Sequence, residues 1–527
     1  MRVLVSDNLS EQGLAILREA PGLTVDYRPG LSEADLAAAI VGASALVVRS
    51  GSKVTAKVIE AADQLRVIGR AGIGVDNVDV ETASKRGIVV MNTPTGNAVT
   101  TAEHAIGLLV SLARMIPEAC RTLKGGKWEK KKFEGRELAG KTLGVIGLGN
   151  IGRIVADRAK GLRMNVIGFD PVLTPARAAS LGIDLVPLET IWERADAITV
   201  HTPLNATTQG LVDDRVVAKL KKGVLLVNAA RGGIYDEAAL LRGLEQGKIG
   251  GVALDVFVEE PPPADHPLVK HERVVVTPHL GASTKEAQDR VATEIAQQAV
   301  AFLTTGAIQN AVNVPSVSSE TAAKLRPYID LAERLGRFLA QVDDLRPRAF
   351  DVECVGEPAE LGMKSIAASA VSGFLQRYID LPVNQVSAPH MAADRGIALR
   401  EMRTERARGK YASQVILRVT TADGSVRSVE GTLGSDGSSR LSKWGEVEIE
   451  AVLGGITLVV ESHDRPGVIG FLGTTLGKAS VNVSRVHLGL SGQVAVSIWN
   501  LDNPVPTDVL AEIRRSSDVK SALAMVI

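Results

Sequence analysis

Three ionisable side chains in the middle of the chain each follow or close a run of aliphatic residues. Arg231 comes after VLLVNAA, Glu260 lies in LDVFVEEPP, and His279 lies in VVVTPHLGAS. A histidine can accept the proton of an alcohol, and a carboxylate bonded to the imidazole orients the ring and stabilises its cationic form. An arginine binds a carboxylate through two parallel N–H donors. The set suits the transfer of a hydride from an alcohol that also carries a carboxylate group.

Each of these residues also has an ordinary structural interpretation. A histidine at the end of a strand can be a simple hydrogen-bonding group, Glu260 before a proline can be a solvated turn residue, and Arg231 beside two glycines can be a surface turn. In open α/β sheets, however, ligands bind beyond the carboxyl ends of the strands. The joint placement of the three residues after strand-like runs therefore favours an active site.

The other histidines of this region offer weaker candidates. His104 lies in the apolar pattern TAEHAIGLL, which predicts a role in helix packing. His201 ends an aliphatic run, while His266 and His271 flank a proline-rich turn. No two of them have the spacing of metal ligands, so the sequence predicts no metal site.

The segment LGVIGLGNIG contains a glycine pattern that is typical of dinucleotide-binding loops. Gly147, Gly149 and Gly152 stand in GxGxxG register after an aliphatic run, and Asn150 and Ile151 open the amphipathic segment that follows. The first glycine permits a tight turn, the second lets the backbone approach a pyrophosphate, and the third allows close packing of helix and strand. A pyrophosphate would then lie at the N-terminus of the helix, where free N–H groups favour an anion.

An acidic residue completes this pattern. Asp170 ends the next aliphatic run, NVIGFD. Its carboxylate can accept hydrogen bonds from the adenosine ribose and would repel a 2′-phosphate, so NAD is favoured over NADP. The alternative is a glycine turn followed by an unrelated aspartate.

These residues need a scaffold of parallel strands, and the length of the chain allows several domains. At roughly 100–200 residues per domain, 527 residues predict about three or four domains. Up to about residue 320, short aliphatic runs alternate with longer amphipathic segments, which indicates βαβ units and parallel sheets. The runs are Arg2–Ser6, Ala45–Val48, Val67–Gly69, Val89–Met91, Leu143–Ile146, Val166–Phe169, Ala197–Val200, Val224–Asn228 and Val274–Thr277.

The last third of the chain shows a different pattern of predicted strands and helices. A helical pattern covers Ala322–Val342, and alternating strands and turn clusters follow up to residue 450, which predicts a mixed α+β domain. From Ile456 the expected order is strand, helix, strand, strand, helix, strand. That order is the ferredoxin-like pattern.

Composition excludes several classes of protein. The chain has 60 Lys and Arg against 60 Asp and Glu, and this zero net charge argues against a nucleic-acid partner. Its only two cysteines, Cys120 and Cys354, suit a reducing compartment and no disulfide scaffold. No signal peptide and no long apolar span are visible, so we expect a cytoplasmic protein with no membrane contact.

Taken together, GLGNIG with Asp170, VNAARGG, LDVFVEEPP and TPHLGAST resemble the NAD-dependent D-2-hydroxyacid dehydrogenase family. RAGIGVDNVD and NTPTGNAVTTAEH add similar segments, and the C-terminal part resembles the long members with an intervening domain and an ACT domain. The resemblance implies two Rossmann-like, doubly wound parallel-sheet domains, a mixed α+β domain and a ferredoxin-like domain. It places a discontinuous substrate domain at residues 1–98 plus 288–318, an NAD domain at 99–287, an intervening domain at 319–455 and the ACT domain at 456–527.

The resemblance also implies an activity. It is the NAD-dependent oxidation of 3-phospho-D-glycerate to 3-phosphohydroxypyruvate, which begins the phosphorylated route to L-serine, in a homotetramer with L-serine as feedback effector. Two alternatives stay open at this stage. The chain could oxidise another D-2-hydroxy acid, such as 2-hydroxyglutarate or glycerate, or it could be a non-catalytic regulator that senses NAD.

Residue roles follow from the same resemblance. Arg231 would bind the substrate carboxylate, His279 would be the acid/base and Glu260 its partner, while Asp255 would contact the nicotinamide carboxamide side. The further cofactor residues would be Thr202, Ala229, Ala230, Arg231, His279 and Gly281. The substrate residues would be Arg49, Ser50, Gly72, Asn97 and Arg231, with Arg49 as the best candidate for the phosphate. In the ACT-like unit, Asp464 and Asn482 would contact the effector.

Overall fold

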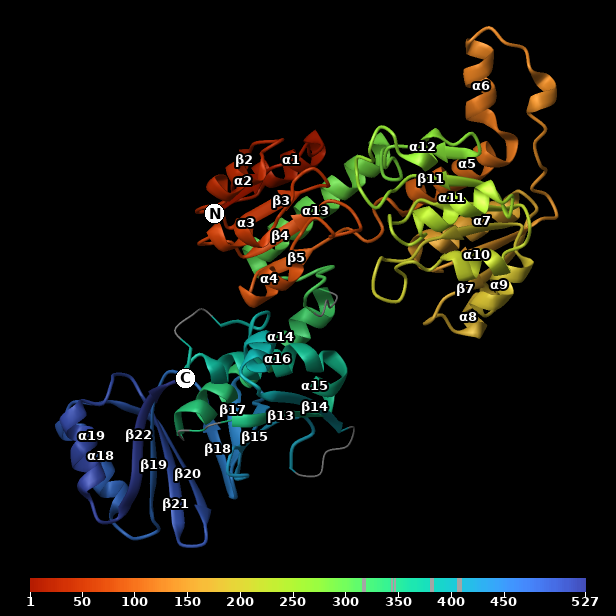
Figure 1. Cartoon of the computed structure of the whole chain (residues 1–527). Coiled ribbons are helices and arrows are strands. Elements are labelled where there is room, and N and C mark those ends of the chain that lie inside the picture. Colours follow the sequence, from red (N-terminus) through yellow and green to blue (C-terminus); the bar gives the residue numbers. More distant parts are fainter. Residues whose placement is uncertain (315–318, 343–344, 346, 380–382, 405–409) are drawn as a thin grey trace.

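The computed structural model describes residues 1–314, 319–342, 345, 347–379, 383–404 and 410–527. These residues form four sheets of five, seven, six and four strands, each with its own helices. We call the four units the first to fourth lobes in chain order. Figure 1 shows the first and second lobes side by side, the third lobe below the first, and the fourth lobe at the far end. The predicted fold class is confirmed.

The first lobe is built on a parallel sheet in the order β2-β1-β3-β4-β5. The runs predicted as strands became β1, β3, β4 and β5, whereas the edge strand β2 was not predicted, because its sequence TVDY is half exposed and carries no aliphatic run. The bounds are β1 (Arg2–Val5), α1 (Glu11–Glu19), β2 (Thr24–Tyr27), α2 (Glu33–Ala39), β3 (Ala45–Val48), α3 (Ala56–Ala61), β4 (Val67–Arg70), α4 (Val80–Lys85) and β5 (Val89–Met91).

A helix from much later in the chain packs on this sheet. α13 (Lys285–Thr305) lies so close to α1 that a Cβ on Gly13 would be 2.8 Å from the Ala292 side chain, and a Cβ on Gly69 of β4 would be 2.8 Å from Ile295. Its apolar residues share one core with β1, β3 and β4. The predicted return segment, 288–318, therefore includes all of this helix except its first three residues, because the helix begins at Lys285. Residues 315–318 lie outside the described residues.

The second lobe has a parallel sheet in the order β12-β11-β10-β9-β6-β7-β8. Counted from β6, this is the dinucleotide-binding order, with the switch point between β6 and β9. The strands are β6 (Thr142–Ile146), β7 (Asn165–Phe169), β8 (Asp184–Leu185), β9 (Ala197–Val200), β10 (Val224–Asn228), β11 (Ile249–Leu254) and β12 (Val274–Val276). The helices are α5 (Ala98–Arg114), α6 (Ile116–Lys124), α7 (Asn150–Gly161), α8 (Pro175–Ser180), α9 (Leu188–Arg194), α10 (Asp214–Lys219), α11 (Glu237–Glu245) and α12 (Pro267–Lys270).

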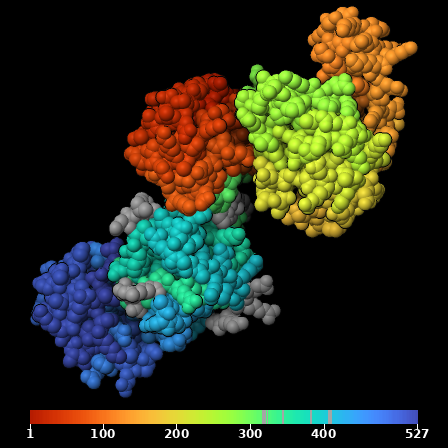
Figure 2. All heavy atoms as spheres, in the orientation of Figure 1, coloured from red at the N-terminus to blue at the C-terminus, as the bar shows by residue number. Residues whose placement is uncertain are grey.

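One part of the second lobe projects away from the rest of the molecule. α6 and the short 3₁₀ helix η1 (Lys130–Lys132) form this arm, which Figure 2 shows standing clear of the lobe. Trp128, between them, is 80% exposed. Within the described part of the chain, no single helix is long and apolar enough to cross a membrane; α5 and α6 meet the length and composition criteria only jointly, across a 63° bend.

The third lobe has a mixed sheet in the order β14-β13-β15-β16-β17-β18, in which β13 and β14 are parallel and the other neighbours antiparallel. α14 and α16 pack on it, and Phe338 and Phe374 are fully buried in their shared core. The bounds are α14 (Ser319–Val342), β13 (Pro347–Val355), α15 (Glu357–Leu361), α16 (Met363–Leu375), α17 (Ala388–Asp394), β14 (Ala398–Thr404), β15 (Gln414–Thr421), β16 (Val426–Leu433), β17 (Ser439–Trp444) and β18 (Val447–Val452).

The fourth lobe has the strand and helix order that the sequence predicted. Its antiparallel sheet runs β20-β21-β19-β22, which is the ferredoxin-like topology. The bounds are β19 (Ile456–His463), α18 (Val468–Lys478), β20 (Val483–Ser491), β21 (Val494–Leu501), α19 (Thr507–Arg515) and β22 (Val519–Val526). The edge strand β20 exposes three apolar side chains, Val486, Leu488 and Leu490. We propose that the four lobes, with α13 assigned to the first, correspond to the four predicted domains.

Candidate active site

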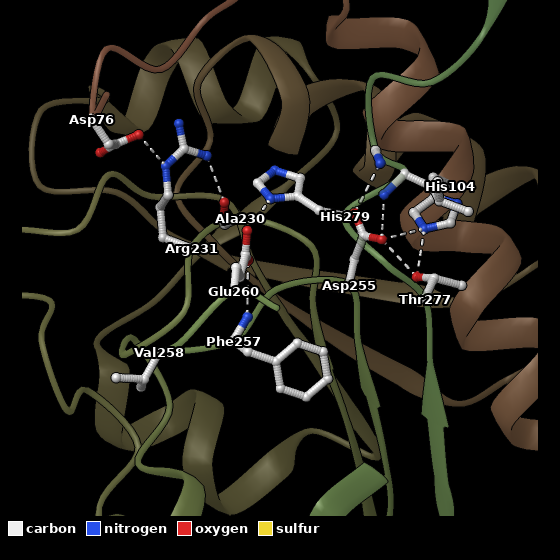
Figure 3. Close-up of polar contacts among 12 residues, drawn as sticks. Asp76, His104, Ala230, Arg231, Asp255, Phe257, Val258, Glu260, Thr277 and His279 are labelled. Carbon is white, nitrogen blue, oxygen red and sulfur yellow. Dashed lines mark hydrogen bonds and ion pairs between the residues drawn. The ribbon is translucent and has the colours of Figure 1, made fainter. Parts of the chain in front are cut away.

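The three ionisable residues meet because they follow three neighbouring strands. Arg231 comes after β10, Glu260 after β11 and His279 after β12, and these strands lie next to one another in the sheet. In a parallel sheet the carboxyl ends of adjacent strands meet at one edge. Figure 3 shows the three side chains gathered there.

His279 and Glu260 form a hydrogen-bonded pair. His279 Nδ1 lies 2.7 Å from Glu260 Oε2, while Glu260 Oε1 accepts the Phe257 N–H at 3.1 Å. The bond to Glu260 raises the pKa of His279 above its usual 6.5, although burial acts in the opposite direction. Burial favours protonation of Glu260, but the bonds from His279 and Phe257 outweigh it and lower the pKa of that carboxyl. Because Nδ1 is occupied by the carboxylate, Nε2 is the nitrogen that can exchange a proton with a ligand.

Arg231 joins the first and second lobes. Its Nε donates to Asp76 Oδ2 at 2.7 Å, from the loop after β4, and its Nη1 donates to the Ala230 carbonyl at 2.6 Å. The same loop needs glycine at position 74, because a Cβ there would lie 1.6 Å from Arg231 Nη2. Sequence reasoning missed Asp76, although it stands inside RAGIGVDNVD, a segment that carried the resemblance.

A second arginine of this region was also missed. Arg70 ends β4, and burial together with the nearby Arg231 lowers its pKa to about 10. Its Nε is buried without a partner, and among the described residues no carboxylate pairs with its guanidinium. Gly72, with a φ of 146°, makes room for this side chain, because a Cβ there would lie 1.5 Å from Arg70 Nη1. A basic residue directly after the aliphatic run VIG was the signal in the sequence.

The other predicted substrate residues differ in their surroundings. Arg49 donates from Nη1 to the Asn8 carbonyl at 2.9 Å, and Ser50 is exposed. Asn97 precedes α5 without capping it, and its buried Oδ1 has no partner in the structure. That orphaned acceptor and the unpartnered Arg70 Nε leave this region with polar groups that a polar ligand could satisfy.

The glycine loop has the geometry that a dinucleotide requires. Gly147 has a φ of 87°, and a Cβ there would lie 2.6 Å from the His201 carbonyl across the switch point. A Cβ on Gly152 would lie 1.9 Å from the Gly147 carbonyl, whereas the space around Gly149, at the start of α7, is open. Gly149 therefore leaves the N-terminus of α7 uncovered, where a pyrophosphate would find free N–H groups.

Two residues beside the loop extend this cradle. Asn150 donates from Nδ2 to the Pro94 carbonyl of the first lobe at 3.1 Å. Arg153, which was not predicted, donates from Nε to the Gly149 carbonyl at 3.1 Å and from Nη2 to Asn150 Oδ1 at 2.9 Å. Its guanidinium thus brings a positive charge to the loop. Ile151 lies half-buried between them in the first turn of α7.

Asp170 is bonded to the same loop. It accepts the Leu148 N–H on Oδ2 at 2.8 Å and the N–H groups of Val172 and Leu173 on Oδ1 at 2.9 and 3.0 Å. A carboxylate offers about four lone-pair positions, so acceptor capacity remains for ribose hydroxyls.

The loops after β9 and β10 line the other side of the switch point. Thr202 has a buried hydroxyl without a partner in the structure, and Ala230 donates its N–H to Asn228 Oδ1 at 3.0 Å, with Ala229 buried beside it. Burial lowers the pKa of His201 to about 3, so this imidazole is neutral at pH 7. The open glycine cradle and the orphaned Thr202 hydroxyl fit a bound dinucleotide.

Asp255 lies behind His279 and was predicted as a cofactor residue. Its carboxylate accepts the Gly281 N–H on Oδ2 at 2.8 Å and lies within hydrogen-bond distance of Thr277 and His104 on Oδ1 (Figure 3). Burial favours protonation of Asp255, but the bonds from His104 and Thr277 outweigh it and lower the pKa of the carboxyl.

The two predicted effector residues lie in the fourth lobe, far along the molecule from these loops (Figure 1). Asp464 is exposed and donates its backbone N–H to the Gln493 carbonyl at 3.1 Å. Asn482 donates its backbone N–H to Asn503 Oδ1 at 3.1 Å and its side-chain amide to Asp502.

Comparison with known proteins places the chain among dehydrogenases. Residues 106–281 match the family described as "D-isomer specific 2-hydroxyacid dehydrogenase, NAD binding domain", and residues 324–444 match the "D-3-phosphoglycerate dehydrogenase intervening domain". The D-3-phosphoglycerate dehydrogenase of Archaeoglobus fulgidus is 39% identical over 99% of both chains. Its namesake from Bacillus subtilis is 38% identical over 99% of this chain and 98% of its own.

Solved structures agree over part of the chain. The TT0316 protein from Thermus thermophilus is 34% identical, with a TM-score of 0.55 over 59% of this chain and 100% of its own. The D-lactate dehydrogenase of Escherichia coli is 26% identical, with a TM-score of 0.53 over 59% of this chain and 100% of its own. The second lobe is thus an NAD-binding domain, and the chain belongs to the D-3-phosphoglycerate dehydrogenase family within the D-isomer-specific 2-hydroxyacid dehydrogenases.

Proposed function

We propose that the chain oxidises the C2 hydroxyl of 3-phospho-D-glycerate to give 3-phosphohydroxypyruvate, with NAD⁺ as the oxidant. The observation that carries this proposal is the His279–Glu260 pair beside Arg231, at the edge of an NAD-binding sheet in a chain whose full-length relatives are D-3-phosphoglycerate dehydrogenases. NAD⁺, when bound, supplies the acceptor for the hydride that leaves C2. The protein must then bind the carboxylate and the phosphate and take the hydroxyl proton.

The residues at hand divide these tasks. His279 Nε2 takes the proton of the C2 hydroxyl, and Glu260 stabilises the imidazolium that results. Arg231 binds the substrate carboxylate with the N–H groups that Asp76 and Ala230 leave free. We assign the phosphate to Arg70 together with Arg49, because Arg70 is a half-buried cation with an unpartnered Nε and, among the described residues, no carboxylate forms an ion pair with it.

Turnover of purified protein tests the proposal. NADH formation is measured with 3-phosphoglycerate, 2-hydroxyglutarate and glycerate, and the reverse reaction with the matching 2-oxo acids. We expect 3-phosphoglycerate to have the highest kcat/KM by about tenfold or more, since only it can use the phosphate site. A higher kcat/KM for another acid would identify that acid as the substrate and contradict the proposal. NAD binding without any turnover would indicate a regulator.

The pH dependence of oxidation gives a second test. Only neutral His279 can take a proton, so kcat/KM rises as the pH increases through the pKa of His279, which the Glu260 bond holds above its usual value. Replacing the carboxylate, in Glu260→Gln, removes the largest cause of the raised pKa of His279. The acid limb of the profile should therefore move to lower pH, and the maximal rate should fall because an amide stabilises the imidazolium less. An unmoved limb would show that another group controls it.

Cofactor choice tests Asp170. In Asp170→Ala we expect the KM for NAD to rise by about tenfold or more and the discrimination against NADP to weaken, because the ribose acceptor and its charge are lost. Asp170→Asn separates two contributions, since it removes the charge but keeps an oxygen for the loop N–H groups. The exposed Asp157 of α7 offers a control, Asp157→Ala. Equal KM values for NAD in all variants would contradict the assignment.

We further propose a homotetramer, inhibited by L-serine bound at Asp464 and Asn482 in the fourth lobe, and a cytoplasmic location. The apolar side chains that β20 exposes on one face of its sheet support contact with a second subunit, and the two free cysteines suit a reducing compartment. The turnover assay is run with and without L-serine, and the mass is measured by light scattering in the same buffers. Turnover that is insensitive to L-serine would contradict the proposed effector, and a dimeric mass would contradict the proposed tetramer.

A further inference from the structure

We propose that His104, on the helix that leaves the first lobe, is a positioning residue that holds Asp255 and through it the loop bearing His279. The apolar pattern around His104 predicts helix packing, whereas the structure gives its ring two polar partners, Asp255 and Thr277. The expected effect of His104 on catalysis rests on the function proposed above. The geometry of the loop that bears His279 does not depend on any substrate. His104 touches none of the reacting groups, so it acts through Asp255.

Asp255 is the group that carries this connection. Its side chain is 1% exposed, and its Oδ1 accepts the Thr277 hydroxyl at 2.6 Å and the Leu280 N–H at 2.7 Å. Its Oδ2 accepts the Gly281 N–H at 2.8 Å, and its backbone carbonyl accepts the N–H of His279 at 2.9 Å. A single residue therefore receives three consecutive N–H groups, of which the first belongs to His279 itself.

The loop needs such support because of its backbone. His279 has a φ of 54°, in the left-handed region that residues other than glycine seldom adopt. A residue in this region keeps its conformation only where the surroundings impose it. The bonds to Asp255 impose it here. The position of the imidazole relative to Glu260 therefore depends on where the Asp255 carboxylate is held.

His104 holds that carboxylate from outside the loop. Its Nε2 lies 3.1 Å from Asp255 Oδ1 and 3.1 Å from Thr277 Oγ1, and Figure 3 shows the ring facing both. Asp255 can only accept when ionised, so Nε2 must carry a hydrogen. The imidazole, the hydroxyl and the carboxylate thus form a closed triangle. The side chain of His104 is only 21% exposed, so water has little access to replace it.

The same face of α5 touches the loop at two further points. Thr101, one turn before His104, donates to the Gly281 carbonyl at 2.9 Å, and Thr100 lies 3.2 Å from the hydroxyl of Thr284. α5 begins where the chain passes from the first lobe to the second. Thr284 caps α13, the helix with which the chain returns to the first lobe. α5 therefore holds the His279 loop along its length, and His104 is the contact nearest to Asp255.

The experiment compares three variants of the full-length protein. His104→Leu removes the donor at similar volume, and His104→Gln keeps an N–H at a similar reach. His271→Leu is the matched control, because His271 is half-buried and its Nδ1 accepts the Arg273 N–H at 3.1 Å, at the opposite end of β12 from Thr277. Each is assayed for kcat, for KM and for hydrogen–deuterium exchange of the peptide covering residues 277–284.

We expect His104→Leu to lower kcat by about 10–100-fold while KM changes less than about threefold, because the acid/base is displaced but the substrate residues are intact. His104→Gln should recover most of this loss, and His271→Leu should match the parent. Exchange in 277–284 should accelerate by about tenfold in His104→Leu alone, because the N–H groups of Leu280 and Gly281 lose their firm acceptor.

The two readouts separate the inference from the proposed function. If no substrate is turned over by the parent protein, the proposed function fails, and the exchange measurement still decides on His104. Unchanged exchange in His104→Leu would overturn the inference, and so would equal losses of kcat in the Leu and Gln variants. A merely structural role would lower the amount of folded protein and leave the kcat of the folded fraction at the parent value, which would also overturn it.

Discussion

Replacing His279 with alanine is expected to lower kcat by about 10²–10⁴-fold, the range in which a positioned general base contributes to catalysis. The reason lies in the geometry of the pair. Glu260 occupies Nδ1 at 2.7 Å and leaves Nε2 as the only ring nitrogen that can receive the hydroxyl proton. Without the ring, the proton must leave to water at the moment of hydride transfer. NADH affinity, measured by fluorescence titration, should change little, because the glycine loop and Asp170 are untouched.

Two further variants make this result interpretable. His279 has a φ of 54°, which alanine adopts poorly but asparagine tolerates, so His279→Asn removes the base without adding backbone strain. If His279→Ala and His279→Asn lose activity to the same extent, the loss is due to the missing proton acceptor and not to backbone strain. His271→Ala, on the segment that leads into β12, controls for the loss of a half-buried histidine. A kcat within about twofold of the parent in His279→Asn would exclude His279 as the base.

Replacing Arg231 with glutamine is expected to lower kcat/KM for the hydroxy acid by about 10²–10³-fold, as when one partner of a buried charge pair is removed. The guanidinium presents a rigid fork to the substrate carboxylate while Asp76 holds its Nε at 2.7 Å. Arg231→Lys keeps the charge but not the fork, so it should recover only part of the loss. NADH affinity should change far less than kcat/KM, because the glycine loop and Asp170 are untouched.

The chain offers a matched control for this second result. Arg242 on α11 forms a two-point bond with Asp214, at 2.9 and 2.6 Å, on the surface of the same lobe. Arg242→Gln should leave kcat/KM unchanged, because exposed pairs contribute little and no active-site loop depends on this one. The comparison is made with saturating NAD and varied substrate. Full recovery in Arg231→Lys would show that a point charge is sufficient and that two-point binding is unnecessary.

The sequence predicted much of this site because its signals are local. Parallel strands that are buried on both faces appear as short aliphatic runs, and the residue after each run lies at the ligand-binding edge. Arg231, Glu260 and His279 could be recognised in this way, and so could the loop from Gly147 to Gly152. Strands without an aliphatic run were not predicted, such as the edge strands Thr24–Tyr27 and Asp184–Leu185.

By itself, then, the sequence determined the type of fold and the cofactor, since periodicity and local motifs specify strands, turns and helix starts. It also singled out the three side chains for which we propose the catalytic roles. Only the tertiary structure decided which distant residues complete the site. Asp76 reaches Arg231 across 155 positions of the chain, and His104 reaches Thr277 across 173. Such partners have no fixed spacing in the sequence. They meet because the order of strands in each sheet and the packing of α5 and α13 between the lobes bring them together. The burial of the unpartnered Arg70 Nε, which makes Arg70 a candidate for the phosphate, is likewise visible only in the tertiary structure.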